Sequence, residues 1–548
     1  MASSIFLLPE IILPIVSCLK NDPYSLHSCM LVSRSWCKLT VPFLWTDPFN
    51  PYSSNTQIIS TYMNSLSSSH KSFLKKIYPM EKLEIDKPPP IFNYTNYLKV
   101  LNYSLLHDAV HAWCDLYRIR SVFKQEDDDD FEECKKESGE YFYDGGDSLL
   151  FNPKIKILEL LFDLLLEKTT LTTLSIKVIT HRYEFCTTLS KLTIDCSWGN
   201  DASSNKLLIS QTCLIELIII NRWPNHLLDS GNNEEENNDT YNNDVYIYTD
   251  VYNENYYNND SNNNDNDDSN YGFLKTIKCL EFKNSEDVDR DNDGSLDVLK
   301  YCENLKVLKF NNWKSFGHKY SLDLADIYFP KLEELLFSTY TPRLDILIKI
   351  IRINGQNLKC LTLVALTHSS IKSANKKFFI KYKLLIETIS ENCPNLITLN
   401  TSISSITMSG HCNLLQRCTW LANLSVEFIH NSQGPFFPTN ESLLLLLGSS
   451  IPISLKQLTL KLTLIFEPKT LHNFLFEHCK ARLEKLKLFM RANNEHFAVL
   501  QEYAKTFGSL KLLDLRNCDG IEQDQFHDSK KYIKEVIIFN SYGERVAW

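Results

Sequence analysis

Glycine is scarce in this chain, at 15 of 548 residues. Nucleotide-binding loops need several closely spaced glycines, and no Gly-x-x-x-x-Gly-Lys-Ser/Thr loop, His-Glu-x-x-His zinc helix or Gly-x-Ser-x-Gly elbow occurs. The adjacent pair His478 and Cys479 could suggest a Cys/His mechanism. We expect Cys479 to pack inward from an outer helix instead. The sequence therefore predicts a protein that is not an enzyme and carries no cofactor.

Closely spaced cysteine pairs are also missing. The chain has 16 cysteines but no Cys-x-x-Cys pair, and the nearest pairs, Cys29 with Cys37 and Cys412 with Cys418, have no matching histidines. This spacing excludes the usual zinc sites, and the low density argues against a secreted disulfide framework. We expect reduced thiols at apolar positions, where cysteine behaves as a small hydrophobic residue.

An excess of basic residues is absent as well. The chain has 57 Lys and Arg against 67 Asp and Glu, and 11 of these acids lie in Asn232–Asn270, which has no bases, 15 Asn and 6 Tyr. The near-neutral remainder argues against a nucleic-acid-binding protein. The insertion, bounded at 229–271, is predicted to be a disordered surface loop, with a regulatory or partner-binding role as the alternative. The acidic run Glu126–Glu133 is predicted to be a second solvated loop.

No run of about 18 apolar residues occurs beyond the N-terminus, so no membrane span is predicted. The opening MASSIFLLPEIILPIVSCLK could be a secretory signal or the first helix of a folded module. A secretory signal begins with basic residues, but nothing basic precedes Lys20, and Pro9, Glu10 and Pro14 interrupt the apolar core. The helical reading is favoured because four apolar residues fall on one helical face: Ile12, Ile15, Val16 and Leu19.

A repeat, Leu-x-x-Leu-x-apolar, organises the C-terminal two-thirds of the chain. Neighbouring copies such as Leu305, Leu332 and Leu358 are 26 or 27 residues apart, the period of a leucine-rich repeat. The copies begin at Leu171, Leu189, Leu214, Ile277, Leu305, Leu332, Leu358, Leu396, Leu421, Leu455, Leu483, Leu510 and Ile533. Leu98, which begins LKVLNY, is a further candidate copy.

Each copy alternates apolar and polar residues as a half-buried strand does. One copy cannot bury its apolar face, so stacked copies should form a parallel sheet inside a curved α/β solenoid, with helices on the outside. In Asn473–Leu486, Phe474, Leu475 and Cys479 should form the apolar face of one such helix. The recurring YCENL, NCPNL and HCKARL segments make the array resemble the cysteine-containing type of leucine-rich repeat.

One stretch imitates a calcium-binding loop. Asp289–Lys300 has acids at positions 1, 3 and 5 and Gly294 at position 6 of an EF-hand pattern. Position 12, which should be a bidentate Glu, is Lys300. We therefore expect an acidic turn before the next outer helix, and no metal site.

The N-terminal residues predict three short helices. Asp22 is a good N-cap and Pro23 a good first helical residue for the second of them. The whole stretch LPEIILPIVSCLKNDPYSLHSCMLVSRSWCKLTVPFLW, residues 8–45, resembles an F-box. Together with the repeats, the chain is similar to F-box/leucine-rich-repeat proteins, particularly those of fungi. Pro14 departs from the family pattern, and we expect the first helix to begin near it or kink there.

The resemblance implies a substrate-recognition subunit of a Skp–cullin–F-box ubiquitin ligase, located in the cytoplasm or nucleus. The F-box would bind the Skp-family adaptor through apolar side chains, and the alternative for each of them is a place in the module's own core. Trp45 is predicted to be core. The candidate adaptor contacts are Leu8, Pro9, Ile12, Ile15, Leu19, Leu26, Cys29, Val32 and Trp36. A cullin–RING core would be a further partner.

The resemblance also implies that the repeats hold a target protein on their concave face. The candidate residues alternate in charge: Lys306, Lys309, Glu333, Glu334, Lys359 and Thr362. The expected domains are 1–49 for the F-box, 50–165 for a helical connector with irregular first repeats, and 166–548 for the repeats with the insertion. Two alternatives remain open: a leucine-rich-repeat scaffold that acts outside a ligase, and a secreted or surface repeat receptor.

Overall fold

The structure is a computed structural model that describes most of the chain. The described residues are 9–49, 56–77, 90–117, 153–177, 188–195, 207–220, 268–283, 296–311, 324–338, 344–363, 376–429, 440–462, 466–518 and 520–546. The acidic run Glu126–Glu133, nearly all of the insertion at 229–271 and most of the calcium-like stretch lie outside them. Among the described helices, none is both long and apolar enough to cross a membrane.

Three helices form a small N-terminal bundle: α1 (Pro9–Cys18), α2 (Pro23–Met30) and α3 (Arg34–Leu44). Side-chain caps set where the second and third helices begin. The Asp22 side chain accepts a hydrogen bond from the Ser25 backbone N–H, and the Ser33 side chain accepts one from the Trp36 backbone N–H. The predicted start of the second helix at Asp22 and Pro23 is therefore confirmed.

Connector helices follow the bundle and pack on the first strands. They are α4 (Thr56–Asn64), α5 (Ser68–Ile77), η2 (Tyr94–Tyr97), α6 (Tyr103–Leu116) and α7 (Pro153–Lys168). The largest buried side chain here is Trp113, whose indole N–H donates a 2.8 Å hydrogen bond to the Ser60 hydroxyl, so α6 and α4 are joined by a polar contact within their apolar interface. Tyr103 packs edge-on against Phe162, which joins α6 to α7.

The strands form one parallel sheet in strict chain order from β1 to β14. They are β1 (Val100–Asn102), β2 (Thr173–Lys177), β3 (Lys191–Asp195), β4 (Glu216–Ile220), β5 (Cys279–Lys283), β6 (Val307–Asn311), β7 (Glu334–Ser338), β8 (Cys360–Leu363), β9 (Thr398–Ile403), β10 (Asn423–Phe428), β11 (Gln457–Lys461), β12 (Lys485–Ala492), β13 (Leu512–Cys518) and β14 (Glu535–Ile538). All thirteen repeat copies and the candidate copy at Leu98 are strands, which confirms the predicted solenoid.

The register aligns equivalent residues of successive repeats. The second Leu of each copy pairs with the second Leu of the next, as Leu308 pairs with Leu335 and Leu335 with Leu361, and all are buried. Two positions further along, the Phe310 ring stacks on Phe282 at 5.1 Å, centroid to centroid, and lies tilted against Phe337 at 5.0 Å. These two buried rows are the core that no single repeat could form alone.

One backbone pattern joins each repeat to the next. The carbonyl of Lys306 accepts hydrogen bonds from the backbone N–H groups of Glu333 and Glu334, at 2.8 and 2.9 Å, and equivalent pairs recur along the array. The pattern extends into the N-terminal bundle, because the Thr46 carbonyl accepts from Lys99 and Val100 at 3.0 Å each. The bundle therefore joins the array by the same bonds that join two repeats.

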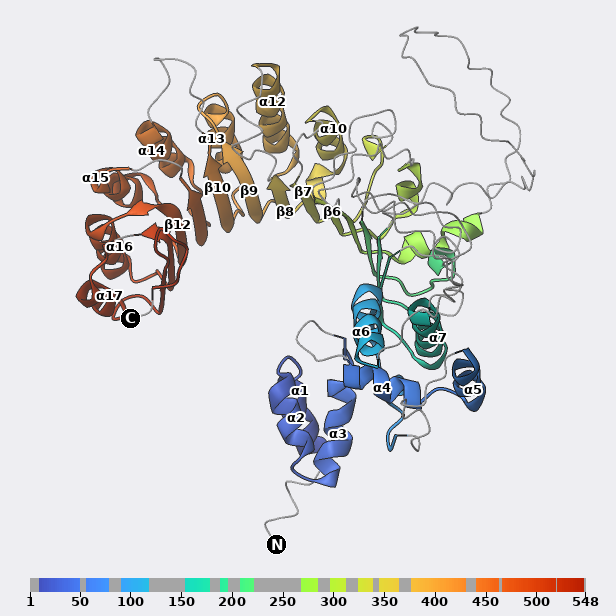
Figure 1. The fold of residues 1–548 in the computed structure, drawn as a ribbon. Helices are drawn as coiled ribbons and strands as arrows, with labels where there is room; N and C mark the ends of the chain where they lie inside the picture. Colours follow the sequence, from blue (N-terminus) through green and yellow to red (C-terminus); the bar gives the residue numbers. More distant parts are fainter. Residues whose placement is uncertain are drawn as a thin grey trace, which may run out of the picture.

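The sheet lines the inside of an arc, and helices cover its outside (Figure 1). The outer elements are η5 (Asp268–Thr276), η6 (Asp297–Tyr301), α10 (Leu344–Asn354), η7 (Gly355–Asn357), α12 (Lys376–Asn392), α13 (Met408–Arg417), α14 (Asn440–Ser450), α15 (Pro468–His472), η8 (Asn473–His478), α16 (Asn494–Phe507) and α17 (Gln523–Ser529). Phe474, Leu475 and Cys479 are buried as predicted. The N-terminal bundle and the last strands lie at opposite ends of the arc.

Candidate functional site

The N-terminal bundle has a core of its own. Ile12, Val16 and Leu26 are fully buried in it, and five side chains pack around them: Leu19, Trp36, Leu39, Phe43 and Leu44. Ile12 and Leu26 are buried in this core, which is the alternative that the sequence left open for each candidate adaptor contact. Several other apolar residues of the bundle are exposed.

Of the remaining candidates, Pro9, Ile15 and Val32 are exposed, whereas Leu19, Cys29 and Trp36 are half-buried. Leu8 lies outside the described residues. The structure adds three exposed apolar side chains that the sequence did not single out: Leu13, Tyr24 and Leu31. We call the exposed set Leu13, Ile15, Tyr24, Leu31 and Val32 the N-terminal apolar surface.

This surface is unusually open to solvent. Tyr24, Leu31 and Val32 are 81%, 75% and 63% exposed, and Leu31 and Val32 are consecutive at the end of α2. The backbone N–H groups of Leu31 and Val32 bond to the carbonyls of Ser28 and Cys29, which fixes both residues where α2 ends. Leu31 and Val32 therefore present two neighbouring apolar side chains to solvent.

Pro14 lies inside α1 and does not start it, because the helix begins at Pro9. The expectation that the helix begins near Pro14 is therefore wrong. A proline inside a helix removes the backbone hydrogen bond that its own nitrogen would have donated, and its ring crowds the carbonyl four residues earlier. The Pro14 carbonyl still accepts a bond, at 2.8 Å, from the Ser17 hydroxyl.

Trp45 joins the bundle to the connector. Its ring lies 4.0 Å from that of Tyr94 and meets the Tyr62 ring edge-on at 5.5 Å, centroid to centroid. Trp45 is only partly buried, and it packs against the large core of the repeat array instead of the bundle's own core, where the sequence predicted it. With the adjacent Thr46 carbonyl, this contact holds the N-terminal apolar surface in a fixed relation to the concave face.

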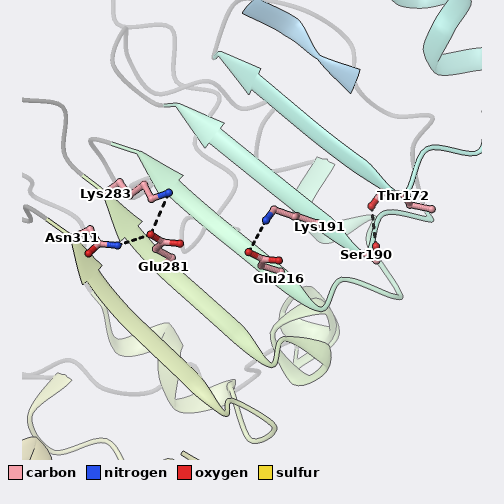
Figure 2. A network of polar contacts seen from close by, with 7 residues as sticks. All are labelled: Thr172, Ser190, Lys191, Glu216, Glu281, Lys283 and Asn311. Atoms are coloured by element: carbon pink, nitrogen blue, oxygen red, sulfur yellow. Dashed lines mark hydrogen bonds and ion pairs between the residues drawn. The ribbon is translucent and has the colours of Figure 1, made fainter. Parts of the chain in front are cut away.

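The first half of the concave face carries charges that pair with one another (Figure 2). Lys191 and Glu216 form an ion pair at 2.8 Å on adjacent strands. Glu281 is nearly buried, and it pairs with Lys283 at 3.2 Å and accepts a 2.5 Å hydrogen bond from the Asn311 side chain. These side chains satisfy one another and so leave little net charge for a partner.

The candidate target-binding residues show the same pairing. Lys306 and Lys359 both contact Glu333, at 3.9 and 3.2 Å, and these three residues lie one position before their strands. Lys309 and Glu334 pair at 3.2 Å. Partial burial lowers the pKa of Lys309, but Glu334 together with Cys279 and Glu281 raises it overall. Thr362 also lies on the concave face, in β8. The alternating signs predicted from the sequence thus form an internal network.

The far end of the concave face differs. Arg516 of β13 lies across the Phe539 ring, with the guanidinium carbon 3.7 Å from the centroid, and 5.7 Å from that of Phe489. Its Nε and Nη2 donate to the two carboxylate oxygens of Asp514 at 2.8 and 3.3 Å. The Asp514 side chain is only 4% exposed. The sequence alone does not reveal this cluster, because Phe489 and Phe539 come from other repeats than Arg516.

The cysteines behave as core residues where they lie on the outer helices and turns. Burial raises the pKa of Cys302 to about 12 and the pKa of Cys479 to about 11. Both thiols are therefore protonated at neutral pH and are weak nucleophiles. His478, next to Cys479, instead makes a 2.7 Å hydrogen bond to the Ser449 hydroxyl.

Comparison with known protein families gives a match at the N-terminus. Residues 9–51 match the F-box-like family. No curated protein matches the chain significantly.

Several solved structures resemble the chain. One is the leucine-rich repeat-containing protein LegL7 from Legionella pneumophila, with 14% identity over 50% of this chain and 89% of that chain and a TM-score of 0.33. Others are the internalin InlF from Listeria monocytogenes, with 12% identity over 68% of this chain and 88% of that chain and a TM-score of 0.29, and the yeast Rad7 and Elc1 complex, with 16% identity over 50% of this chain and 80% of that chain and a TM-score of 0.29. The chain thus has an F-box-like domain at residues 9–51, followed by a leucine-rich-repeat solenoid.

Proposed function

We propose that this protein is the substrate-recognition subunit of a Skp–cullin–F-box ubiquitin ligase, acting in the cytoplasm or nucleus. The N-terminal apolar surface carries the proposal. The bundle completes its own core with Ile12, Val16 and Leu26, yet still exposes Leu31 and Val32. Each such side chain would contribute about 1.5 to 3 kcal/mol when a partner covers it fully, so several together support a stable complex with a Skp-family adaptor.

The repeat array would present the target to the ligase. An F-box-like domain joined to leucine-rich repeats is typical of non-catalytic adaptor proteins. The Thr46 carbonyl and the Trp45 ring hold the two parts together. A target bound to the concave face would therefore lie in a defined position relative to the adaptor, which transfer of ubiquitin requires.

Affinity purification of the full chain from its own cells tests the proposal. Both the Skp-family adaptor and a cullin should co-purify, and Leu31→Glu should remove both together. Recovery of the adaptor without cullin would instead support a leucine-rich-repeat scaffold that acts outside a ligase. A form of the chain that carries N-linked glycans and lacks its first residues would support a secreted receptor.

A further inference from the structure

Two histidines lie side by side on a connector helix. His107 and His111 are four residues apart in α6, so both side chains project from the same side of that helix. Their ring centroids are 4.2 Å apart, and the ring planes are tilted by 32°. The His107 side chain is 41% exposed and His111 is half-buried, so solvent reaches both. Neither residue belongs to the F-box-like domain or to a strand of the concave face.

A carboxylate orients one of the two rings. His107 Nδ1 lies 3.1 Å from Asp108 Oδ1. An ionised carboxylate can only accept a hydrogen bond, so Nδ1 of the neutral imidazole carries the proton and Nε2 keeps its lone pair. Metal-binding histidines are commonly held in this way, with one ring nitrogen bonded to a carboxylate and the other to the metal ion. Asp108 therefore prepares His107 Nε2 for coordination.

The charges around the pair favour a cation. Three charged side chains act electrostatically on His111: Asp108, Asp115 and Lys154. Lys154 of α7 forms an ion pair with Asp115 at 2.5 Å, which offsets one of the two carboxylates. When both imidazoles are neutral, these three groups leave one net negative charge beside the histidines, and negative charge attracts cations.

We propose that His107 and His111 bind one divalent transition-metal ion through a nitrogen of each imidazole. Imidazole suits Zn²⁺, Ni²⁺ and Cu²⁺, whereas Ca²⁺ and Mg²⁺ take oxygen ligands. Two histidines four residues apart on one helix face also hold the zinc ion in His-Glu-x-x-His helices, and the stretch here is HDAVH, residues 107–111. This site is independent of the proposed function.

The geometry of the pair suits such an ion. A tetrahedral zinc ion with bonds of about 2.0 to 2.1 Å holds two histidine nitrogens about 3.3 Å apart. Rings whose centroids are 4.2 Å apart can reach this separation by small side-chain rotations. Among the described residues, no group of three or more His, Cys, Asp and Glu side chains could share an ion, so water would complete the coordination shell. The ion should therefore bind reversibly and stabilise α6, which Trp113 and Tyr103 join to α4 and α7.

Calorimetric titration of the untagged full chain with NiCl₂ tests this. Ni²⁺ is the probe because imidazole suits it and because, unlike Cu²⁺, it does not oxidise the free thiols of the chain. The wild type should bind Ni²⁺ at least tenfold more tightly than His107→Gln or His111→Gln. The double variant should bind no more weakly than either single variant, because one histidine alone cannot chelate the ion. His527→Gln, which removes a single exposed histidine of α17, should leave the affinity unchanged.

Asp108→Asn removes the negative charge behind His107 Nδ1 and should weaken Ni²⁺ binding about tenfold. Melting temperatures without metal report whether each variant folds. Equal Ni²⁺ affinities in the wild type and the two single histidine variants would overturn the proposal. Losses that add up in the double variant would show two independent histidines and would overturn the shared ion. Adaptor binding without metal should be unaltered in every variant, so failure here is separate from failure of the proposed function.

Discussion

The imidazole of His411 lies 3.3 Å from the hydroxyl of Thr401, inside the repeat array. Thr401 occupies an inward strand position that is Val426 in the next repeat and Phe337 two repeats earlier. The Thr401 hydroxyl also contacts the Tyr382 hydroxyl at 3.1 Å, and His411 Nδ1 lies 2.9 Å from the Thr407 carbonyl. This repeat therefore has a polar core whose groups satisfy one another.

That network makes stability depend on pH. Burial lowers the pKa of His411 to about 4, although the Thr407 carbonyl opposes the change. In the unfolded chain the pKa is about 6.5, so between these values only the unfolded chain binds the proton. The contribution of His411 to the free energy of unfolding should be fully present above about pH 6.5. It should fall toward pH 4, by up to about 1.4 kcal/mol per pH unit.

Urea unfolding midpoints at pH 7.5, 6.0 and 5.0 measure this effect. In His411→Gln the loss between pH 7.5 and pH 5.0 should be clearly smaller than in the wild type. His107→Gln, which replaces an exposed histidine on α6, should behave as the wild type does. An equal loss in the wild type and His411→Gln would show that other groups cause the pH dependence.

Two buried tyrosines should respond oppositely to loss of their hydroxyl. The Tyr62 hydroxyl is buried and meets no hydrogen-bond partner among the described residues, so Tyr62→Phe should stabilise the protein by about 1 kcal/mol. The Tyr503 hydroxyl donates to the Ala481 carbonyl at 3.2 Å and accepts from the Leu483 N–H at 3.1 Å, so Tyr503→Phe should cost about 1 to 3 kcal/mol. Chemical denaturation measures both, and changes of the same sign would contradict the assignment.

The row of buried leucines should be intolerant of truncation. Leu424 is buried between Leu399 and Leu458, so Leu424→Ala should cost about 2 to 5 kcal/mol, because it leaves a cavity. Ile453→Ala removes a similar volume from an exposed side chain and should change stability by less than about 0.5 kcal/mol. Comparable losses in the two variants would contradict the placement of Leu424 in the buried row of leucines.

Trp420 occupies a position where other repeats use a hydrogen-bonding residue. Asn304, Asn357 and Asn395 stand directly before the first Leu of their copies, and each donates a side-chain bond of 2.7 to 2.9 Å to a backbone carbonyl of the preceding repeat. Trp420 is instead 70% exposed. Trp420→Asn should add the missing bond and raise stability by about 0.5 to 1.5 kcal/mol in thermal unfolding. A lower melting temperature would show that the Trp420 side chain contributes packing of its own.

The strands could be predicted from the sequence because the buried positions of each repeat follow from residues that are neighbours in the chain. Leu-x-x-Leu-x-apolar alternates with period two, and every copy from Leu171 to Ile533 became a strand. The F-box-like domain was also predicted, since its residues follow one another in order. The sequence did not predict which apolar residues of that domain face outward. Ile12 and Leu31 are equally apolar, and only the packing of the three helices buries one and exposes the other.

Contacts between repeats could be predicted least. The ion pair of Lys309 with Glu334 and the contact of Arg516 with Phe539 each join residues more than 20 positions apart. Their geometry depends on the register of the stacked strands, which the spacing of the copies alone does not specify. The alternation of Lys and Glu therefore suggested an open binding face where the structure shows paired charges.

The central claim is that the N-terminal apolar surface binds a Skp-family adaptor, and calorimetric titration of the purified adaptor into the full chain tests it most directly. We expect a stable complex that Leu31→Glu weakens at least a hundredfold. Ile453→Glu, which places the same charge on an equally exposed apolar residue of the repeats, should leave it unchanged. Undiminished binding by Leu31→Glu, or no binding by the wild-type chain, would contradict the account.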